Sequence, residues 1–475
     1  MCADPQDGIV LLLERARQLA ARAEDAEAKQ AYVDVLRRDP THLAALKELG
    51  ALAHASGHRS AARTAWQQAV HYHPGDPAAR INLGNLLYAD GEFAAARAQY
   101  EAVLAVQAGL AEAHQGLARV LTRIGETDAA APHWQKGFAG HEVVVQRYRG
   151  ASPPIPVLLL VSVEDGNIPT RQLLDDRVFA VTALYTEFYD SARALPPHAF
   201  VFNAIGDADL CATALARAEA VVARTAAPVI NLPARVRTTG RVANAQRLAK
   251  VPGVRTAEMR TMTRAALPNA EGLHFPLLLR APGFHTGRHF LRVERQHDLA
   301  LAIADLPGNE LLVIEYLDAR GADGMARKYR VMIIDGVPYP LHLAISADWK
   351  VHYFTADMAA NAACRAEEQR FLDNMPAVLG PGAMAALRGI GETLGLDYAG
   401  VDFAPAADGS ILLFEANATM VINPPDPDPI WDYRRAPIQR ALDAVRQMLL
   451  SAADRQKEKA QQLTHPTAGF RVIDQ

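Results

Sequence analysis

The segment DYAGVDFAPAADGSILLFEAN, residues 397–417, holds two apolar runs separated by the dipeptide Asp408-Gly409. Asp-Gly between apolar runs is typical of a tight turn, so the segment predicts a β-hairpin. Asp402 lies on the first predicted strand, and Glu415 and Asn417 lie two residues apart on the returning strand. Because side chains alternate along a strand, Glu415 and Asn417 share one side, and a turn at Asp408 brings Asp402 opposite Glu415.

Two carboxylates and an amide oxygen are hard ligands of the kind that Mg²⁺ or Mn²⁺ prefers. No His or Cys accompanies them in this segment, which disfavours zinc. Asp402, Glu415 and Asn417 are therefore the predicted metal ligands. The alternative is that the two carboxylates pair with lysine or arginine across the hairpin.

Upstream of the hairpin, residues from about 256 onward predict an α+β pattern of strands, a hairpin that turns at Asp335-Gly336, and helices over roughly 365–394. Before that, residues 198–207 and 228–233 are strand-like and flank a predicted helix over 210–224, which indicates a parallel βαβ unit. The glycine-rich dinucleotide fingerprint, the P-loop and the G-x-S-x-G elbow are all missing, so these enzyme classes are not supported.

The first 150 residues carry an internal period of 34 residues. Glycine recurs at 57, 91 and 125, alanine at 62, 96 and 130, and an aromatic residue at 66, 100 and 134. This pattern resembles the tetratricopeptide repeat (TPR) family, in which each repeat is a pair of helices and stacking buries a shared core. The resemblance implies a concave surface for a protein or peptide partner. The alternative is a scaffold or dimer contact that never touches substrate.

Composition and motif content limit the remaining possibilities for partners, location and domain boundaries. A net charge of −4 gives no support for nucleic-acid binding, and Cys2, Cys211 and Cys364 are too far apart to suggest a disulfide framework. We expect no signal peptide, no membrane span and a cytoplasmic location. The proline-rich stretch at 150–156 predicts a linker, giving repeats at 1–149, an α/β domain at 157–250, an α+β domain at 251–450 and a tail at 451–475. The sequence does not indicate an oligomeric state.

Residues from about 156 to 450 resemble the ATP-grasp carboxylate–amine ligases, which include glutathione synthetase, D-alanine–D-alanine ligase and RimK-like enzymes. The hairpin carries the family's Asp and Glu-x-Asn, and four upstream segments follow in the family's order. The resemblance implies an all-α solenoid followed by a pre-ATP α/β domain and an ATP-grasp domain. It implies ATP and Mg²⁺ (or Mn²⁺) as cofactors, and carboxylate and amine substrates joined through an acyl phosphate.

The resemblance also assigns roles to residues. Arg330 would hold the γ-phosphate and the acyl phosphate, and is the implied catalytic residue. The ATP-binding residues would be Arg241, Arg280, Gly283, Gly287, Glu315, Tyr316 and Leu317. The alternatives are an ordinary glycine turn at Gly283 and Gly287, and a surface salt bridge for Arg330.

One feature departs from the family pattern, because arginine stands at two positions, 241 and 280, where the family has lysine. Arginine can still bind phosphate, but not as a point charge. A nucleotide-binding pseudo-ligase that acts as an adaptor therefore stays an alternative. A small-molecule kinase, which would use the same ATP site, is a further alternative. After the hairpin, Trp431, Arg434 and Arg435 are candidates for binding a substrate carboxylate.

Overall fold

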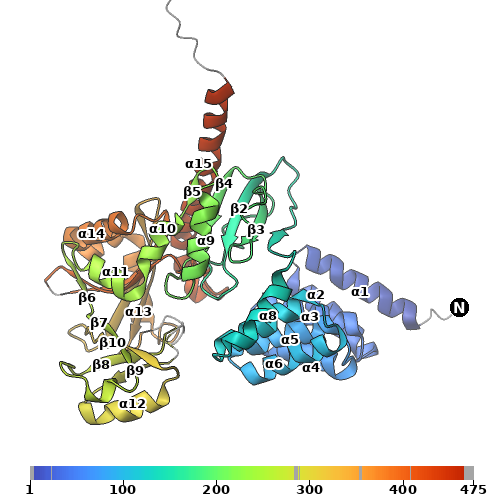
Figure 1. Ribbon diagram of the computed structural model, residues 1–475, viewed down its shortest axis with the longest axis horizontal. Coiled ribbons are helices and arrows are strands. Elements are labelled where there is room, and N and C mark those ends of the chain that lie inside the picture. The colour runs from blue at the N-terminus through green and yellow to red at the C-terminus, as the bar shows by residue number, and fades with distance from the viewer. Residues whose placement is uncertain are drawn as a thin grey trace, which may run out of the picture. The chain divides into compact units, whose positions relative to one another are not determined.

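The computed structural model describes residues 5–22, 24–282, 287, 289–351, 356–406 and 408–464; the side chains of 5–7 and 458–464 are outside the description. The chain divides into two compact units, Met1–Glu142 and Val143–Gln475. Figure 1 shows the first unit as helices only and the second as several sheets with helices around them.

The first unit consists of four successive helix pairs. The helices are α1 Pro5–Ala21, α2 Asp25–Arg38, α3 Leu43–Ala55, α4 Arg59–Tyr72, α5 Pro77–Asp90, α6 Phe93–Val106, α7 Ala111–Arg123 and α8 Thr127–Phe138. Gly57, Gly91 and Gly125 lie just after α3, α5 and α7 with φ of 79°, 82° and 85°. Only glycine adopts this conformation without steric cost, so the periodic glycines let the chain turn after the first helix of each pair.

The aromatic residues fill the space that small residues leave between helices. A Cβ added at Gly50 would lie 2.4 Å from Trp66 Nε1, and one added at Gly84 would lie 2.9 Å from the Tyr100 ring. Tyr100 also contacts Gly116 of the next repeat, where a Cβ would lie 2.3 Å from the ring. The Tyr100 ring is therefore held between two glycine surfaces from successive repeats.

Ion pairs at the same repeat position join successive repeats. Arg63 Nη2 donates to Glu92 Oε2 at 2.9 Å, and Arg97 Nη1 donates to Glu126 Oε2 at 3.1 Å. Both arginines and both glutamates are separated by the 34-residue period. All four side chains are in contact with solvent, which screens the pairs, so each pair contributes little to stability.

A histidine pair joins α7 to α8. His114 Nδ1 lies 2.8 Å from His133 Nδ1, and His114 Nε2 lies 2.9 Å from the carbonyl oxygen of Ala108. A carbonyl only accepts, so His114 Nε2 carries the proton and its Nδ1 accepts from His133. Burial, followed by His114 and Lys136, lowers the pKa of His133.

The second unit begins with a five-stranded sheet of order β1-β3-β2-β4-β5, in which only β1 is antiparallel to its neighbour. The strands are β1 Val143–Val145, β2 Ile155–Val161, β3 Phe179–Tyr185, β4 Phe200–Asn203 and β5 Val229–Ile230. Helix α9, Ala212–Val222, connects the parallel strands β4 and β5, so the predicted βαβ unit is confirmed. The boundary between the units lies after residue 142, because β1 pairs with this sheet, and β2 begins inside the expected 150–156 linker.

A four-stranded antiparallel sheet of order β7-β10-β8-β9 follows, with α12, Leu299–Asp305, beside it. Its strands are β7 Met259–Thr263, β8 Leu277–Arg280, β9 Phe290–Val293 and β10 Glu310–Glu315. The third sheet has the order β12-β11-β13-β14-β6, with β6 parallel to β14 and the other pairs antiparallel. Its strands are β6 Val254–Thr256, β11 Ala326–Ile334, β12 Val337–Ser346, β13 Tyr398–Pro405 and β14 Ile411–Asn417.

Both predicted hairpins of the third sheet are present. Asp335 and Gly336 have φ of 49° and 78° between β11 and β12, and Gly409 has φ of 81° between β13 and β14. Helices α13 Ala362–Asp373 and α14 Met375–Leu394 lie between β12 and β13 in the chain, and α15 Arg435–Thr464 comes after β14. All three contact this sheet. Helix α15 continues past residue 450, where the tail was expected to begin.

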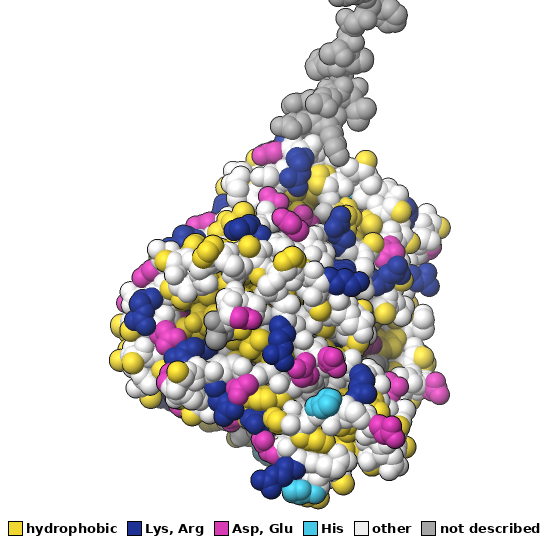
Figure 2. Space-filling view, turned by 90° about the vertical axis from the view of Figure 1, so that its left-hand side faces the viewer, with side chains coloured by type: hydrophobic (Ala, Val, Ile, Leu, Met, Phe, Trp, Pro, Cys, Tyr) yellow, Lys and Arg dark blue, Asp and Glu magenta, His cyan; other side chains and the backbone are white. Residues whose placement is uncertain are grey.

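The chain thus has a helical repeat region followed by a mixed α/β region with three sheets. Within the described residues, no helix combines the length and apolar character needed to cross a bilayer. On the face shown in Figure 2, basic and acidic side chains are interspersed rather than gathered by sign.

Candidate functional site

The hairpin of β13 and β14 places the predicted metal ligands on neighbouring strands. Asp402 is the register partner of Glu415, and it is also the register partner of Arg330 on β11. A β-bulge between Asp402 and Phe403 shifts the register at this point. Three strands therefore bring Arg330, Asp402 and Glu415 into one row across the sheet. The position of the Asp408-Gly409 turn predicts the pairing of Asp402 with Glu415 but not the place of Arg330.

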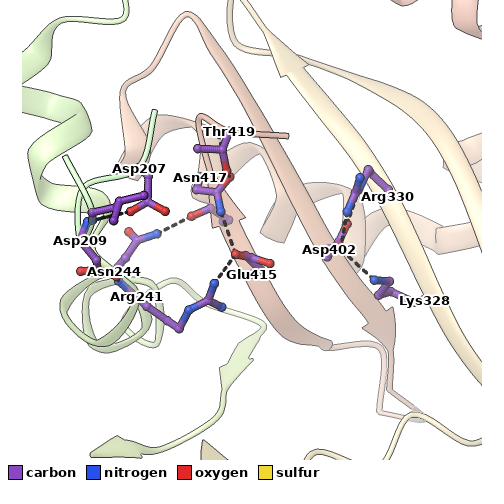
Figure 3. A network of polar contacts seen from close by, with 12 residues as sticks. Asp207, Asp209, Arg241, Asn244, Lys328, Arg330, Asp402, Glu415, Asn417 and Thr419 are labelled. Atoms are coloured by element: carbon purple, nitrogen blue, oxygen red, sulfur yellow. Dashed lines mark hydrogen bonds and ion pairs between the residues drawn. The ribbon is translucent and has the colours of Figure 1, made fainter. Parts of the chain in front are cut away.

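Asp402 is a buried carboxylate between two cations (Figure 3). Arg330 donates from Nε and Nη2 to its two oxygens at 2.6 and 2.8 Å, and Lys328 Nζ lies 3.2 Å from Oδ2. Burial alone would raise the pKa of Asp402, but Arg330 and Lys328 outweigh it and hold the pKa far below its ordinary value. Asp402 is therefore ionised, and its single negative charge faces the two positive charges of Arg330 and Lys328.

Glu415 forms a separate contact group beside Asp402. Arg241 Nη2 donates to Glu415 Oε1 at 2.6 Å, and the Asn417 amide nitrogen donates to the same oxygen at 2.9 Å. Burial of Glu415 opposes its ionisation, but Arg241 and Arg280 outweigh it and lower its pKa. Asn417 Oδ1 accepts from the backbone and hydroxyl of Thr419, both at 2.9 Å.

Helix α11, Arg241–Leu248, positions Arg241 from another part of the chain. The backbone N–H of Arg241 donates to Asp209 at 2.9 Å, and Asn244 donates to the carbonyl oxygen of Ala416 at 2.7 Å. Asn244 is buried and ties the helix directly to β14. The guanidinium of Arg241 is thus aimed at Glu415 by contacts at both ends of the first turn of α11 (Figure 3).

The predicted site residues line one cavity of about 400 Å³. Its lining includes Arg241, Arg280, Gly287, Glu315, Tyr316, Leu317, Arg330, Asp402, Glu415 and Asn417. Gly283 lies outside the described residues. Gly287 has φ of 71°, and a Cβ there would lie 2.7 Å from Lys350 Cε, so the backbone approaches a second lining residue closely.

The cavity concentrates positive charge. Burial and then the neighbouring Arg241 lower the pKa of Arg280 to about 10, and its guanidinium lies 5.7 Å from the centre of the Phe290 ring. Two arginines that oppose each other's charge favour an anion between or beside them. Apolar side chains, among them Leu278, Ile314 and Phe414, form another part of the lining.

The end of β10 and the residue after it are held by side-chain contacts. The Glu315 carboxylate accepts from Arg255 at 2.8 Å and from the backbone of Glu258 at 3.1 Å. The Arg292 guanidinium lies 4.2 Å from the centre of the Tyr316 ring. These contacts fix the backbone of this segment beside the apolar lining.

Sequence reasoning missed two residues of this site. Lys328 stands two positions before Arg330 on β11, and this spacing puts both side chains on the same side of the strand, which is the signal that could have identified it. Asn244 carries no such signal, because its role depends on a contact to a backbone carbonyl 172 residues away.

The comparisons bear on the first unit. A crystal structure of MamA is 23% identical over 26% of this chain and 72% of that chain, with a TM-score of 0.25. A tetratricopeptide repeat protein from Parabacteroides merdae ATCC 43184 is 18% identical over 29% of this chain and 54% of that chain, with a TM-score of 0.27. No curated protein matches the chain. The tetratricopeptide repeat family matches residues 52–109 and 82–139, within the four helix pairs. The N-terminal unit therefore contains tetratricopeptide repeats.

Proposed function

We propose that the second unit is an ATP-dependent carboxylate–amine ligase of the ATP-grasp type, which forms an amide through an acyl phosphate. The observation that carries the proposal is the lining of the 400 Å³ cavity. Residues expected from the family resemblance to contact nucleotide and metal come from α11, β8, β10, β11, β13 and β14, and they converge on this one space.

The charge in the cavity suits a polyphosphate. Arg241, Arg280, Lys328 and Arg330 all line it, and arginine binds phosphate oxygens through two parallel N–H donors. A phosphate beside Arg280 would offset the repulsion from Arg241 that contributes to its lowered pKa. Arginine at positions 241 and 280 is thus compatible with phosphate binding, although the family has lysine there.

The apolar part of the cavity suits the adenine ring. Leu278, Ile314 and Leu317 are buried beside it, and Tyr316 and Phe414 add aromatic surface. The backbone of residues 315–317 would supply the hydrogen bonds that recognise the ring edge. This arrangement matches general ligand sites, which combine an apolar wall with a few polar groups.

The oxygen donors fit Mg²⁺ or Mn²⁺ in type. Asp402, Glu415 and Asn417 would hold the ion; among the described residues, Glu415 Oε2 has no hydrogen-bond partner. When bound, the ion would neutralise charge on the phosphate oxygens. Phosphates that attract Arg330 and Lys328 would weaken their hold on Asp402 and leave its oxygens available.

The chain's own groups then support two steps. A substrate carboxylate oxygen attacks the γ-phosphorus and ADP leaves; Arg330 and Lys328 stabilise the charge on the transferred group. An amine attacks the carbonyl carbon of the acyl phosphate, inorganic phosphate leaves and the amine loses a proton. Positioning and charge supply the rate, and no covalent enzyme intermediate is needed.

A second candidate function is a nucleotide-binding adaptor without turnover. The observation that favours it is the complete pairing of Asp402 with Arg330 and Lys328, which matches the ion-pair alternative for the hairpin carboxylates. A kinase that phosphorylates a small molecule would use the same cavity and would form no amide.

In either case we propose that the tetratricopeptide repeats bind a protein or peptide partner. Stacked helix pairs present an extended surface of the kind that such arrays use for binding.

The test is phosphate release from ATP in the presence of Mg²⁺ and pools of acids and amines, with product mass analysis. Glu415→Gln should remove turnover without unfolding the chain, and Glu392→Gln, an exposed position on α14, is the matched control. ATP binding without phosphate release would favour the adaptor, and a phosphorylated product without amide would favour the kinase. Absence of ATP binding would refute the proposal.

A further inference from the structure

A second cavity of about 270 Å³ adjoins the first in the second unit. Lys328, Arg330, Val421 and Asn423 line both, so the two spaces share a wall. A molecule in the second cavity therefore lies within reach of the cations that pair with Asp402. The volume is slightly below the range of roughly 300–1,000 Å³ for drug-sized ligand sites, which indicates a small ligand.

The second cavity is lined by more cationic than anionic side chains. Lys328, Arg330 and Arg434 line it, and Asp426 is the one carboxylate residue among its described lining residues. His342, which is also part of the lining, is buried. Burial and then Arg330 lower its pKa well below the ordinary value, with smaller contributions from Lys328 and Arg434, and outweigh the opposite effect of Asp402. The His342 imidazole is therefore uncharged at neutral pH, so the positive charge of the lining comes from the lysine and arginine side chains alone.

Arg434 is a fixed cationic group at a different part of the lining. It ends η4, Pro429–Arg434, and its side chain is 8% exposed. Its Nε lies 3.4 Å from Glu368 Oε1, and Glu368 itself accepts from the Leu343 backbone at 3.2 Å and from the Tyr433 hydroxyl. Such a buried network holds the guanidinium in one place.

The remaining lining is mainly nonpolar. Leu341 and Met358 are buried, and the Trp431 ring centre lies 5.9 Å from the Arg434 guanidinium carbon. Arg435, by contrast, is exposed and pairs with Asp432 at 2.7 Å outside the lining. Of the three residues that sequence reasoning offered for a substrate carboxylate, Trp431 and Arg434 line the cavity and Arg435 does not.

We infer that the second cavity binds a small acid with two anionic groups joined by a nonpolar segment, one beside Lys328 and Arg330 and the other beside Arg434. That the first group is the reacting carboxylate rests on the proposed function. This carboxylate becomes an acyl phosphate and then a neutral amide, so it loses its charge during the reaction. Arg434 holds the group that does not react and keeps the molecule in place through both steps.

The test measures binding to the full chain by calorimetry. The probes are the straight-chain dicarboxylates from succinate to suberate, each matched with the monocarboxylate of the same carbon number. Each dicarboxylate can make a second charge-assisted contact that the matched monocarboxylate cannot. We therefore expect the best dicarboxylate to bind about tenfold tighter than its match, or more. Equal affinity within every pair, or no binding of any dicarboxylate, would overturn the inference.

A variant locates the second contact. Arg434→Met together with Glu368→Gln removes both members of the buried pair, so that neither charge is left alone. We expect the double variant to lose the preference for dicarboxylates, while Arg435→Met keeps it. A double variant that folds and retains the preference would overturn the inference. If it does not fold, the comparison of probes on the unaltered chain still decides.

Nucleotide binding separates this inference from the proposed function. ATP titrations on the same proteins should give the same affinity for the unaltered chain and the double variant. If ATP binds and dicarboxylates show no preference, the inference alone fails. If dicarboxylates are preferred and ATP does not bind, the proposed function fails and the anion site stands.

Discussion

Replacing Gly116 by alanine should destabilise the repeat unit, although alanine is the better helix former. Gly116 lies inside α7, and the added Cβ would lie 2.3 Å from the Tyr100 ring, which is 1% exposed and cannot move into solvent. The Tyr100 hydroxyl also donates to Asn85 at 2.7 Å, so a displaced ring would strain that hydrogen bond.

The magnitude follows from three terms. A contact of 2.3 Å is far inside van der Waals distance, so overpacking costs about 2–3 kcal/mol, the upper part of its usual range. The weakened hydrogen bond adds up to about 1 kcal/mol. The helix propensity of alanine returns about 1 kcal/mol. The net loss of unfolding free energy is therefore about 1–3 kcal/mol.

The assay is urea unfolding of the full chain followed by far-UV circular dichroism, with attention to the transition of the helical unit. Gly109→Ala is the matched control, because nothing lies within 4 Å of a Cβ there. Tyr100→Leu should lower the free energy of unfolding less in the Gly116→Ala protein than in the unaltered chain. The difference is the coupling energy, which we expect to be about 1 kcal/mol or more. A Gly116→Ala protein as stable as the unaltered chain would refute the reasoning.

Two further predictions concern pH and the division of the chain. Folding lowers the pKa of His133 from its ordinary value of 6.5. As the pH falls toward and below 6.5, the unfolded chain therefore binds more protons than the folded chain, and the helical unit loses stability. His133→Gln should flatten the dependence of the unfolding midpoint on pH between about 7.5 and about 5.5, and an unchanged dependence would contradict the assignment. Deleting residues 1–142 should leave a soluble fragment that binds ATP as the full chain does, because the chain divides at this point; an aggregating fragment, tested by size-exclusion chromatography and ATP titration, would contradict this.

The elements that sequence predicted best are those set by local chemistry. The glycines of the 34-residue period and the turns at Asp335-Gly336 and Asp408-Gly409 need positive φ, and that need is visible in the residue type itself. The hairpin register followed from the position of its turn, so the pairing of Asp402 with Glu415 could be predicted as well.

Contacts between distant segments could not be predicted in this way. Strand β1 joins the first sheet although its three residues follow the repeats directly, which moved the boundary ahead of the proline-rich stretch. The pairing of Asp402 with Lys328, and of Asn244 with Ala416, depends on which strands and helices become neighbours. Periodicity along one segment carries no information on its partners in space.

Lys328 and Arg330 form a wall between the two cavities, so we expect ligand binding in the two cavities to be thermodynamically linked. An anion bound in one cavity partly neutralises Lys328 and Arg330 and so changes their attraction for an anion in the other cavity. If the first ligand alters the affinity of the second by some factor, the second must alter the affinity of the first by the same factor. Affinities measured with one ligand at a time would therefore differ from the affinities that apply when both ligands are present.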